Sequence, residues 1–325
     1  MTAVECEERV IGCFKGLATG DAIGKQTETL MRADIHEWYS GGITGFHGQP
    51  GDVIPRYLGK RYLWRIGETT DDTEQTIAVA RAILREGGAR HEAIGKELLQ
   101  CKKSVHPGVS LWSFLQRGDP ARIASEGDGC GAAMRVAPVG VIFPPDRLDR
   151  LIRGAYECAI PTHGGQLAIC AAAAVACAVS AAVEGAPATE VMAAAVMASQ
   201  KAEAFRPSRR ASTISASLEK IYSDLRTRKR LVAADIAEQY CPDKTENIIP
   251  VAISLALITG SAEETALLAA NIGGDADSVA SIGGAIAGAL CPVSVNERWF
   301  EVVNSVNGDA ILEIAASLAA MRTRG

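Results

Sequence analysis

Two short runs of oxygen-bearing side chains lie far apart in the sequence, and each directly precedes an apolar helical pattern. The first run is residues 69–73 (Thr-Thr-Asp-Asp-Thr), and the second is residues 273–278 (Gly-Gly-Asp-Ala-Asp-Ser). Carboxylate and hydroxyl oxygens are the ligands that hard divalent cations such as Mg²⁺ and Mn²⁺ prefer. If the two helix starts meet in space, the sequence predicts a cation site between them.

Helix capping is the alternative interpretation of either run. A hydroxyl or carboxylate at residues 70–72 can accept a hydrogen bond from a free backbone N–H group of the helix, with Glu74 in support. One cap uses one side chain, and the helix dipole favours about one more acidic group. Capping therefore explains one or two oxygens in a run but not the occurrence of two such runs, and we favour a shared cation site.

The Asp-x-Asp spacing of the second run also occurs in phosphatases that use an aspartate nucleophile. In those enzymes the motif follows a buried strand, whereas residues 265–271 have a helical pattern here. The helical context argues against that class.

Composition sets limits on the partners and the compartment. The 33 basic and 38 acidic residues give a formal net charge of −5, so we expect neither nucleic acid nor an anionic membrane as a partner. The basic residues within 206–230 lack interleaved aromatic side chains beyond Tyr222, which favours a solvated helix. Nine cysteines without a Cys-x-x-Cys pair, and an acidic N-terminal segment unlike a signal peptide, predict reduced thiols in the cytoplasm.

Apolar residues recur three and four positions apart along most of the chain, which predicts an all-α fold in one compact multi-helix domain, 1–325. The almost wholly apolar segment 167–183 is rich in alanine and lacks aromatic or basic flanks, so we expect a buried central helix and not a membrane span. The predicted helices are 5–23, 72–86, 91–102, 132–139, 147–158, 165–184, 188–203, 212–225, 233–239, 247–259, 262–271, 277–290 and 310–321.

Glycines interrupt this helical pattern in two informative ways. Gly12, Gly16, Gly20 and Gly24 recur every fourth residue, which leaves one helix face without side chains for a close neighbour. Residues 41–65 contain too many glycines and prolines for a helix and precede the first acidic run, so we expect a long functional loop or lid there.

Five motifs in order resemble those of the ADP-ribosylglycohydrolase family, which includes ADP-ribosylhydrolases. The motifs span most of the chain, and together they are more specific than any one alone. They are Gly20-Asp-Ala-Ile-Gly24 with Glu28, Thr70-Asp-Asp-Thr73, Gly131-Ala-Ala-Met-Arg-Val-Ala-Pro138, Thr162-His163, and Gly273-Gly-Asp-Ala-Asp-Ser278.

The resemblance implies a pair of Mg²⁺ or Mn²⁺ ions at the mouth of a cleft in an all-α domain. It implies hydrolysis of a glycosidic bond to ribose, with the ions polarising ribose hydroxyls and positioning water while carboxylates carry the proton. The expected partner is ADP-ribose or an ADP-ribosylated protein, and we expect a monomer. The implied metal ligands are Thr70, Asp71, Asp72, Asp275, Asp277 and Ser278, and the implied catalytic residues are Glu28, Asp71 and Asp277.

The same resemblance assigns a substrate-binding group, comprising Gly127, Asp128, Gly129, Cys130, Gly131 and His163. The glycines leave backbone N–H groups available beside a helix start, which suits an anion such as a diphosphate. His163 could contact the substrate or cap a helix. Arg135 could pair with phosphate, with an aspartate or in a structural salt bridge, and Asp21 could be a hydrogen-bonded core acid or an orienting residue.

The sequence departs from the usual family pattern near this predicted diphosphate loop. Cys130 replaces a frequent asparagine, and Glu126 and Asp128 would repel phosphate unless they turn away. Ser278 replaces a threonine but keeps the hydroxyl oxygen. Two alternatives follow: the same ribosyl hydrolysis on a substrate without a diphosphate, or a non-catalytic binding protein on this scaffold, although the acidic residues that such a protein would lack are all present.

Overall fold

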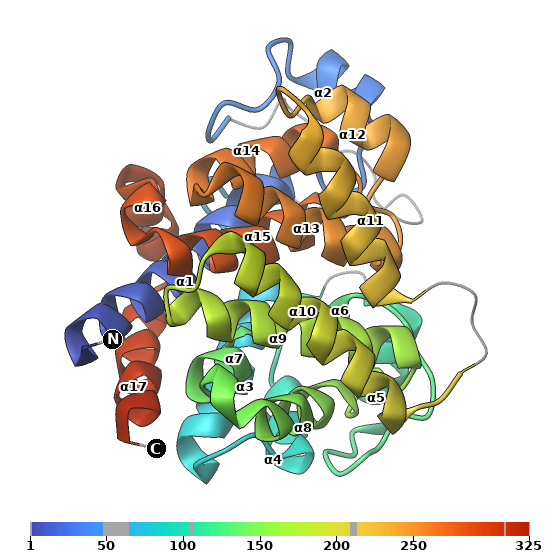
Figure 1. The fold of residues 1–325 in the computed structure, drawn as a ribbon, viewed down its shortest axis with the longest axis vertical. Helices are drawn as coiled ribbons and strands as arrows, with labels where there is room; N and C mark the ends of the chain where they lie inside the picture. The colour runs from blue at the N-terminus through green and yellow to red at the C-terminus, as the bar shows by residue number, and fades with distance from the viewer. Residues whose placement is uncertain (1, 48–64, 105–106, 209–212, 309, 325) are drawn as a thin grey trace.

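Helices account for every regular element in the part of the chain that the computed structural model describes, which confirms the all-α prediction (Figure 1). The described residues are 2–47, 65–104, 107–208, 213–308 and 310–324. The α-helices are α1 (Ala3–Gly24), α2 (Arg32–Trp38), α3 (Asp71–Glu86), α4 (His91–Leu98), α5 (Val109–Arg117), α6 (Gly131–Met134), α7 (Ala137–Ile142), α8 (Leu148–Ala159), α9 (Gln166–Val183), α10 (Ala188–Ala202), α11 (Ile214–Thr227), α12 (Ala233–Tyr240), α13 (Thr245–Thr259), α14 (Ala262–Ile272), α15 (Ala276–Leu290), α16 (Glu297–Asn307) and α17 (Ala310–Arg324). Short 3₁₀ turns are η1 (Lys25–Thr27), η2 (Pro145–Arg147), η3 (Glu203–Phe205) and η4 (Pro292–Ser294).

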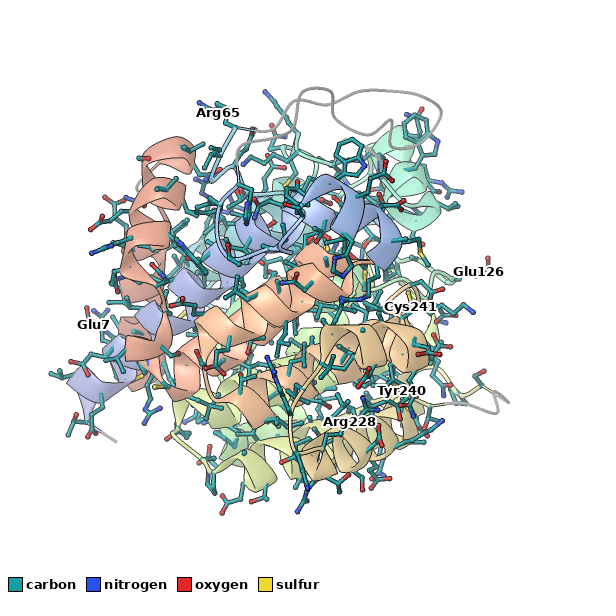
Figure 2. The ribbon with its side chains drawn as sticks, turned by 90° about the horizontal axis from the view of Figure 1, so that it is seen from above. Glu7, Arg65, Glu126, Arg228, Tyr240 and Cys241 are labelled. Carbon is teal, nitrogen blue, oxygen red and sulfur yellow. The ribbon has the colours of Figure 1, made fainter. Side chains whose placement is uncertain are left out.

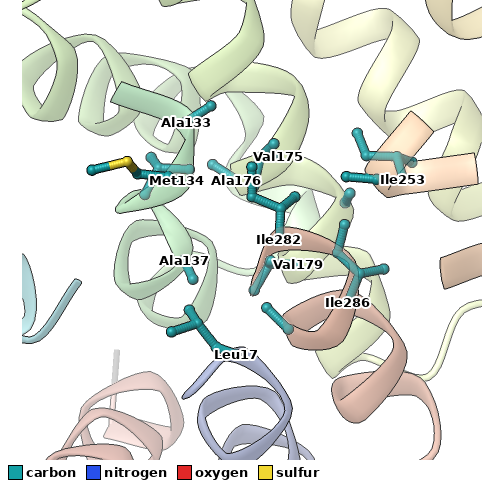
Figure 3. Close-up of a cluster of buried hydrophobic side chains, with 14 of the residues drawn as sticks. Leu17, Ala133, Met134, Ala137, Val175, Ala176, Val179, Ile253, Ile282 and Ile286 are labelled. Carbon is teal, nitrogen blue, oxygen red and sulfur yellow. The ribbon is translucent and has the colours of Figure 1, made fainter. Parts of the chain in front are cut away.

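The alanine-rich helix α9 lies in the core of a single compact domain, as predicted. It is long and apolar enough to cross a membrane, with a mean hydropathy of 2.1, but 94% of it is buried inside the structure. Its Val175 and Val179 lie in one apolar cluster with Ile282 of α15 and Leu17 of α1 (Figure 3). The small alanine side chains let the surrounding helices approach α9 closely.

Helices α1 and α15 lie side by side in antiparallel orientation, and the glycine step in α1 is the reason (Figure 1). A Cβ atom at Gly16 would lie 2.2 Å from the backbone oxygen of Gly284, and one at Gly20 would lie 2.1 Å from that of Ala280. No side chain fits between the two backbones. Because of this contact, the C-terminal end of α1 lies next to the N-terminal end of α15, where the second acidic run is located.

Gly16→Ala is therefore expected to lower the free energy of unfolding by about 1–3 kcal/mol or more. That range is the usual cost of inserting a methyl group into a well-packed core. The obstacle is backbone, which cannot rotate away as a side chain can. Gly88→Ala is the matched control, because a Cβ atom there meets nothing within 4 Å. Urea unfolding of both variants measures the difference, and equal stabilities would contradict the close-packing interpretation.

Several predicted boundaries were wrong. The helix predicted over 132–139 is two short helices, α6 and α7, because Pro138 has no N–H to donate to the carbonyl of Met134. That carbonyl accepts a hydrogen bond from Thr76 Oγ1 at 3.3 Å instead. The helix predicted over 91–102 ends at Leu98.

Three short helices, α2, α5 and α16, were not predicted at all. Most of the predicted loop 41–65 lies outside the described residues. Its described part, 41–47, contains no helix.

Candidate active site

Asp21, at the C-terminal end of α1, fixes the start of α3. Its carboxylate accepts hydrogen bonds from the backbone N–H of Thr70 at 3.0 Å and of Thr73 at 3.1 Å, and from Thr73 Oγ1 at 2.5 Å. Asp21 is fully buried, and burial raises its pKa while these hydrogen bonds act in the opposite direction. Both readings of Asp21 hold at once: it is a buried, hydrogen-bonded acid, and it orients the first acidic run.

The side chains of the first acidic run have different hydrogen-bond partners, and one of their oxygens has none in the described chain. Thr70 is the N-cap of α3 and accepts a hydrogen bond from the backbone N–H of Asp72 at 3.0 Å, so the capping interpretation holds for this residue. Asp71 accepts from Ser104 Oγ at 2.7 Å and from Gln75 Nε2 at 2.8 Å. Asp72 Oδ1 is buried and has no hydrogen-bond partner within the described chain.

The second acidic run meets the first. Gly273 and Gly274 have φ angles of +82° and +67°, so the chain turns sharply between α14 and α15. Asp275 accepts a hydrogen bond from the Cys130 thiol at 3.0 Å. Ser278 and Asp275 lie close enough to Asp72 to influence its pKa, so the two helix starts meet as the sequence predicted. Asp277 Oδ1, like Asp72 Oδ1, is buried without a partner in the described ranges.

Glu28 lies next to this cluster and is held by its backbone neighbours. Its side chain pairs with Lys25 and is 21% exposed. The following residue, Thr29, has a φ of +65°, which is rare for a β-branched residue. The Thr29 N–H donates to the Gly274 carbonyl at 2.7 Å, and the Gly274 N–H donates to the Leu30 carbonyl at 3.0 Å. This strained turn ties Glu28 to the second acidic run.

Burial and mutual repulsion dominate the electrostatics of the cluster. Burial raises the pKa of Asp71 to about 6, and the charge on Glu28 adds to the effect. The pKa of Asp72 is well above its ordinary value through burial and the charges on Asp21 and Asp71. Burial and the charge on Glu28 raise the pKa of Asp277 in the same way. A cation placed among these oxygens would relieve the repulsion.

The donor set fits a hard divalent cation. Among the described residues no three His, Cys, Asp or Glu side chains converge as a ready-made metal site. The two unpartnered buried oxygens, Asp72 Oδ1 and Asp277 Oδ1, nevertheless have nothing to offset their desolvation. Carboxylate and hydroxyl oxygens of this kind suit Mg²⁺ or Mn²⁺.

The predicted substrate loop joins the acidic cluster to an open cavity of about 450 Å³. Gly127, Asp128 and Arg206 help to line the cavity, while Cys130 contacts Asp275. Gly127 has a φ of +103°, and a Cβ atom there would lie 2.2 Å from Ser110 Oγ. The loop therefore requires glycine at this point.

The two acids that flank the loop behave differently. Asp128 Oδ1 accepts a hydrogen bond from the Leu167 N–H at 2.9 Å, at the N-terminus of α9. The helix start partly offsets its charge. Glu126 lines the same cavity but is exposed, and Figure 2 shows it at the edge of the molecule. Glu126 is therefore the acid whose charge at the cavity is not offset by a helix start, and it is the one expected to repel phosphate.

Comparison with known proteins identifies the family of this chain. The family model for ADP-ribosylglycohydrolase matches residues 2–325. The chain belongs to the ADP-ribosylglycohydrolase family. A solved ADP-ribosylglycohydrolase-related protein complex superposes with a TM-score of 0.69 at 26% identity, covering 98% of this chain and 99% of the other.

Curated relatives of this chain differ in how much is known of them. An uncharacterised protein of Archaeoglobus fulgidus is 31% identical over 311 residues, covering 91% of each chain. The ADP-ribosyl-[dinitrogen reductase] glycohydrolase of Rhodospirillum rubrum is 30% identical over 149 residues, which cover 43% of this chain and 47% of the relative. The family supports ADP-ribosyl hydrolysis as the general activity.

Sequence reasoning missed several polar residues that the fold places around the site. Lys25 pairs with Glu28, and Gln75 and Ser104 hold Asp71. Gln75 lies one helical turn after Asp71, a spacing that could have signalled the contact. Ser104 comes from a segment that carried no signal in the sequence, and Arg206 belongs to the basic run 206–230 that was interpreted as a solvated helix.

Arg135 does not form the salt bridges considered for it. It is fully buried, yet it forms no ion pair with any described residue, and its partners are uncharged. Pairing with an aspartate and a structural salt bridge were therefore wrong alternatives, while pairing with phosphate stays a prediction.

Proposed function

We propose that this protein is a divalent-metal-dependent hydrolase that cleaves the glycosidic bond between ADP-ribose and a modified side chain, arginine or serine, or a small molecule. The observation that carries the proposal is the meeting of two acidic helix starts that leave Asp72 Oδ1 and Asp277 Oδ1 buried and unpartnered in the described structure. Family membership supplies the type of bond. Two Mg²⁺ or Mn²⁺ ions would be held by Thr70, Asp71, Asp72, Asp275, Asp277 and Ser278.

The bound ions would supply Lewis acidity toward the ribose hydroxyls and a water molecule. Glu28 is suited to accept a proton from the attacking water, because its side chain is near the cluster and still 21% exposed to solvent for proton release. Lys25 holds this carboxylate in place. Asp71 is held by Ser104 and Gln75, and this fixes the direction of its carboxylate.

The loop 127–131 and its cavity are the proposed position for the rest of ADP-ribose. Gly127 and Asp128 of the loop line the cavity, and its lining residues include one cationic side chain, Arg206. We also propose a reducing, cytoplasmic environment, supported by nine cysteines that are all free thiols.

The test is release of ADP-ribose from arginine-linked and serine-linked ADP-ribosylated peptides by protein stripped with chelator. We expect no release without metal and release from at least one substrate after addition of Mg²⁺ or Mn²⁺. No turnover of any ADP-ribosyl compound under either condition would reject the proposal.

Glu126 supports one alternative, a ribosyl substrate without a diphosphate, since its exposed carboxylate faces the cavity. Calorimetry separates the two. Metal-dependent binding of ADP-ribose that is tighter than binding of ribose 5-phosphate would support the diphosphate substrate, and the reverse order would support the alternative.

A further inference from the structure

A chain of hydrogen bonds runs through the buried interior from the acidic cluster to His163. Arg135 donates through Nη1 to Gln75 Oε1 at 2.8 Å, and Gln75 Nε2 donates to Asp71 at 2.8 Å. In the other direction, Arg135 Nη2 donates to Thr162 Oγ1 at 2.7 Å. Thr162 Oγ1 lies 2.7 Å from His163 Nδ1.

The chemistry of each group fixes the direction of these bonds. A guanidinium group only donates, so Thr162 Oγ1 must be an acceptor toward Arg135. Among the described residues, His163 Nδ1 is the only other hydrogen-bond partner of Thr162 Oγ1. Donation to an unprotonated Nδ1 is therefore the arrangement that also places the Thr162 hydroxyl proton in a hydrogen bond. A neutral imidazole with a bare Nδ1 carries its proton on Nε2.

The surroundings of His163 favour this neutral form. The side chain is 7% exposed, and burial together with the Arg135 charge lowers its pKa to about 3. A proton on Nδ1 would leave the Thr162 hydroxyl proton without an acceptor among the described residues.

The free edge of the ring faces the predicted substrate loop. A Cβ atom at Gly131 would lie 3.2 Å from His163 Nε2, and one at Gly129 would lie 3.3 Å from it. Because both residues are glycines, neither places a side chain over this edge. Nε2 has no hydrogen-bond partner in the part of the chain that is described.

We propose that Arg135 is a positioning residue that acts through Thr162 to hold His163 as the Nε2–H tautomer, so that Nε2 is a fixed hydrogen-bond donor to a ligand oxygen at the loop 127–131. The same guanidinium orients Gln75 toward Asp71. Arg135 thus determines which atom of Gln75 and which atom of Thr162 acts as an acceptor, and so which groups donate to Asp71 and to His163. The inference deepens the proposed function, and it rests on that function only for the identity of the ligand.

Thr162→Val and Thr162→Ser are the decisive variants, since Arg135 is fully buried and its replacement would also affect folding. Valine keeps the shape but removes the hydroxyl, whereas serine keeps the hydroxyl. Nitrogen-15 NMR of histidine-labelled protein reports which ring nitrogen carries the proton, and the chain has only five histidines to assign with the help of His163→Asn. We expect the Nε2–H pattern for His163 in the ligand-free wild type and in Thr162→Ser, and a mixture of tautomers in Thr162→Val.

Calorimetry with ADP-ribose as the probe gives the second readout. Loss of one oriented hydrogen bond is expected to weaken binding about 3- to 10-fold in Thr162→Val and to leave Thr162→Ser close to the wild type. An Nδ1–H or doubly protonated His163 in the wild type would overturn the inference, as would an unchanged tautomer and affinity in Thr162→Val. If ADP-ribose does not bind the wild type, the proposed function fails, while the wild-type tautomer still decides this inference.

Discussion

Asp277→Asn should lower the rate of ADP-ribose release by about 1,000-fold, because a metal ion contributes several kcal/mol of charge stabilisation and each 1.36 kcal/mol is tenfold in rate. The same change should raise the melting temperature of the metal-free protein. Asp277 is buried among Glu28, Asp72 and Asp275, so removing its charge relieves repulsion. A lower rate together with a higher melting temperature is the result expected for a functional site whose like charges repel one another when no cation is bound.

Asp235→Asn is the matched control, since Asp235 is an exposed acid on α12, away from the cluster. It should leave both the rate and the metal-free melting temperature close to the wild type. Kinetics and thermal melts in the presence of chelator measure both quantities. An Asp277→Asn protein that keeps its activity would remove Asp277 from the proposed metal ligands, and one that is inactive and less stable would point to a structural role.

The stability of the metal-free protein should fall as the pH is raised from about 5 to about 8. An unfolded aspartate loses its proton near pH 3.9, whereas burial raises the pKa of Asp71 in the folded protein to about 6 and raises the pKa values of Asp72 and Asp277 well above their ordinary value. The folded chain therefore holds extra protons in this range. Their stabilising effect is complete below the unfolded pKa and is lost as the pH rises through the folded pKa values.

Added Mn²⁺ should reverse this trend, because the cation replaces the protons that the cluster loses. The increase in melting temperature on adding Mn²⁺ should be larger at about pH 8 than at about pH 5, where protons compete with the metal. Thermal melts over this range, with and without Mn²⁺, check the expectation. A metal-free protein that becomes more stable toward pH 8 would show that the carboxylates do not repel one another as described.

The acidic cluster could be predicted from the sequence because its parts are local signals. Thr70 and the acids after it mark a helix start, and the glycines at 273 and 274 mark the turn before α15. The glycine step in α1 likewise predicted a close neighbour, although the sequence did not say that the neighbour is α15. Pairing of the two runs was inferred from the type of residue, and the proximity of Asp72 to Asp275 and Ser278 confirms it.

The elements that were missed depend on tertiary contacts. Helix α16 contains several valines and follows a proline-containing turn, which weighs against a helix on propensity alone. Its cap, Asn296, was a usable signal, since the side chain accepts a hydrogen bond from the Trp299 N–H at 3.2 Å. The hydrogen bonds of Arg135 join residues up to 60 positions apart, and no spacing in the sequence could reveal them.

Titration of Mn²⁺ into chelator-stripped protein, with bound metal counted by electron paramagnetic resonance and ADP-ribose release measured in the same samples, tests the metal-dependent account most directly. We expect two Mn²⁺ ions to bind per chain and hydrolysis to rise in step with the bound metal. Asp277→Asn should lose both responses, while Asp235→Asn should keep them. Full hydrolysis in the presence of chelator, or Mn²⁺ binding that Asp277→Asn leaves unchanged, would contradict the account.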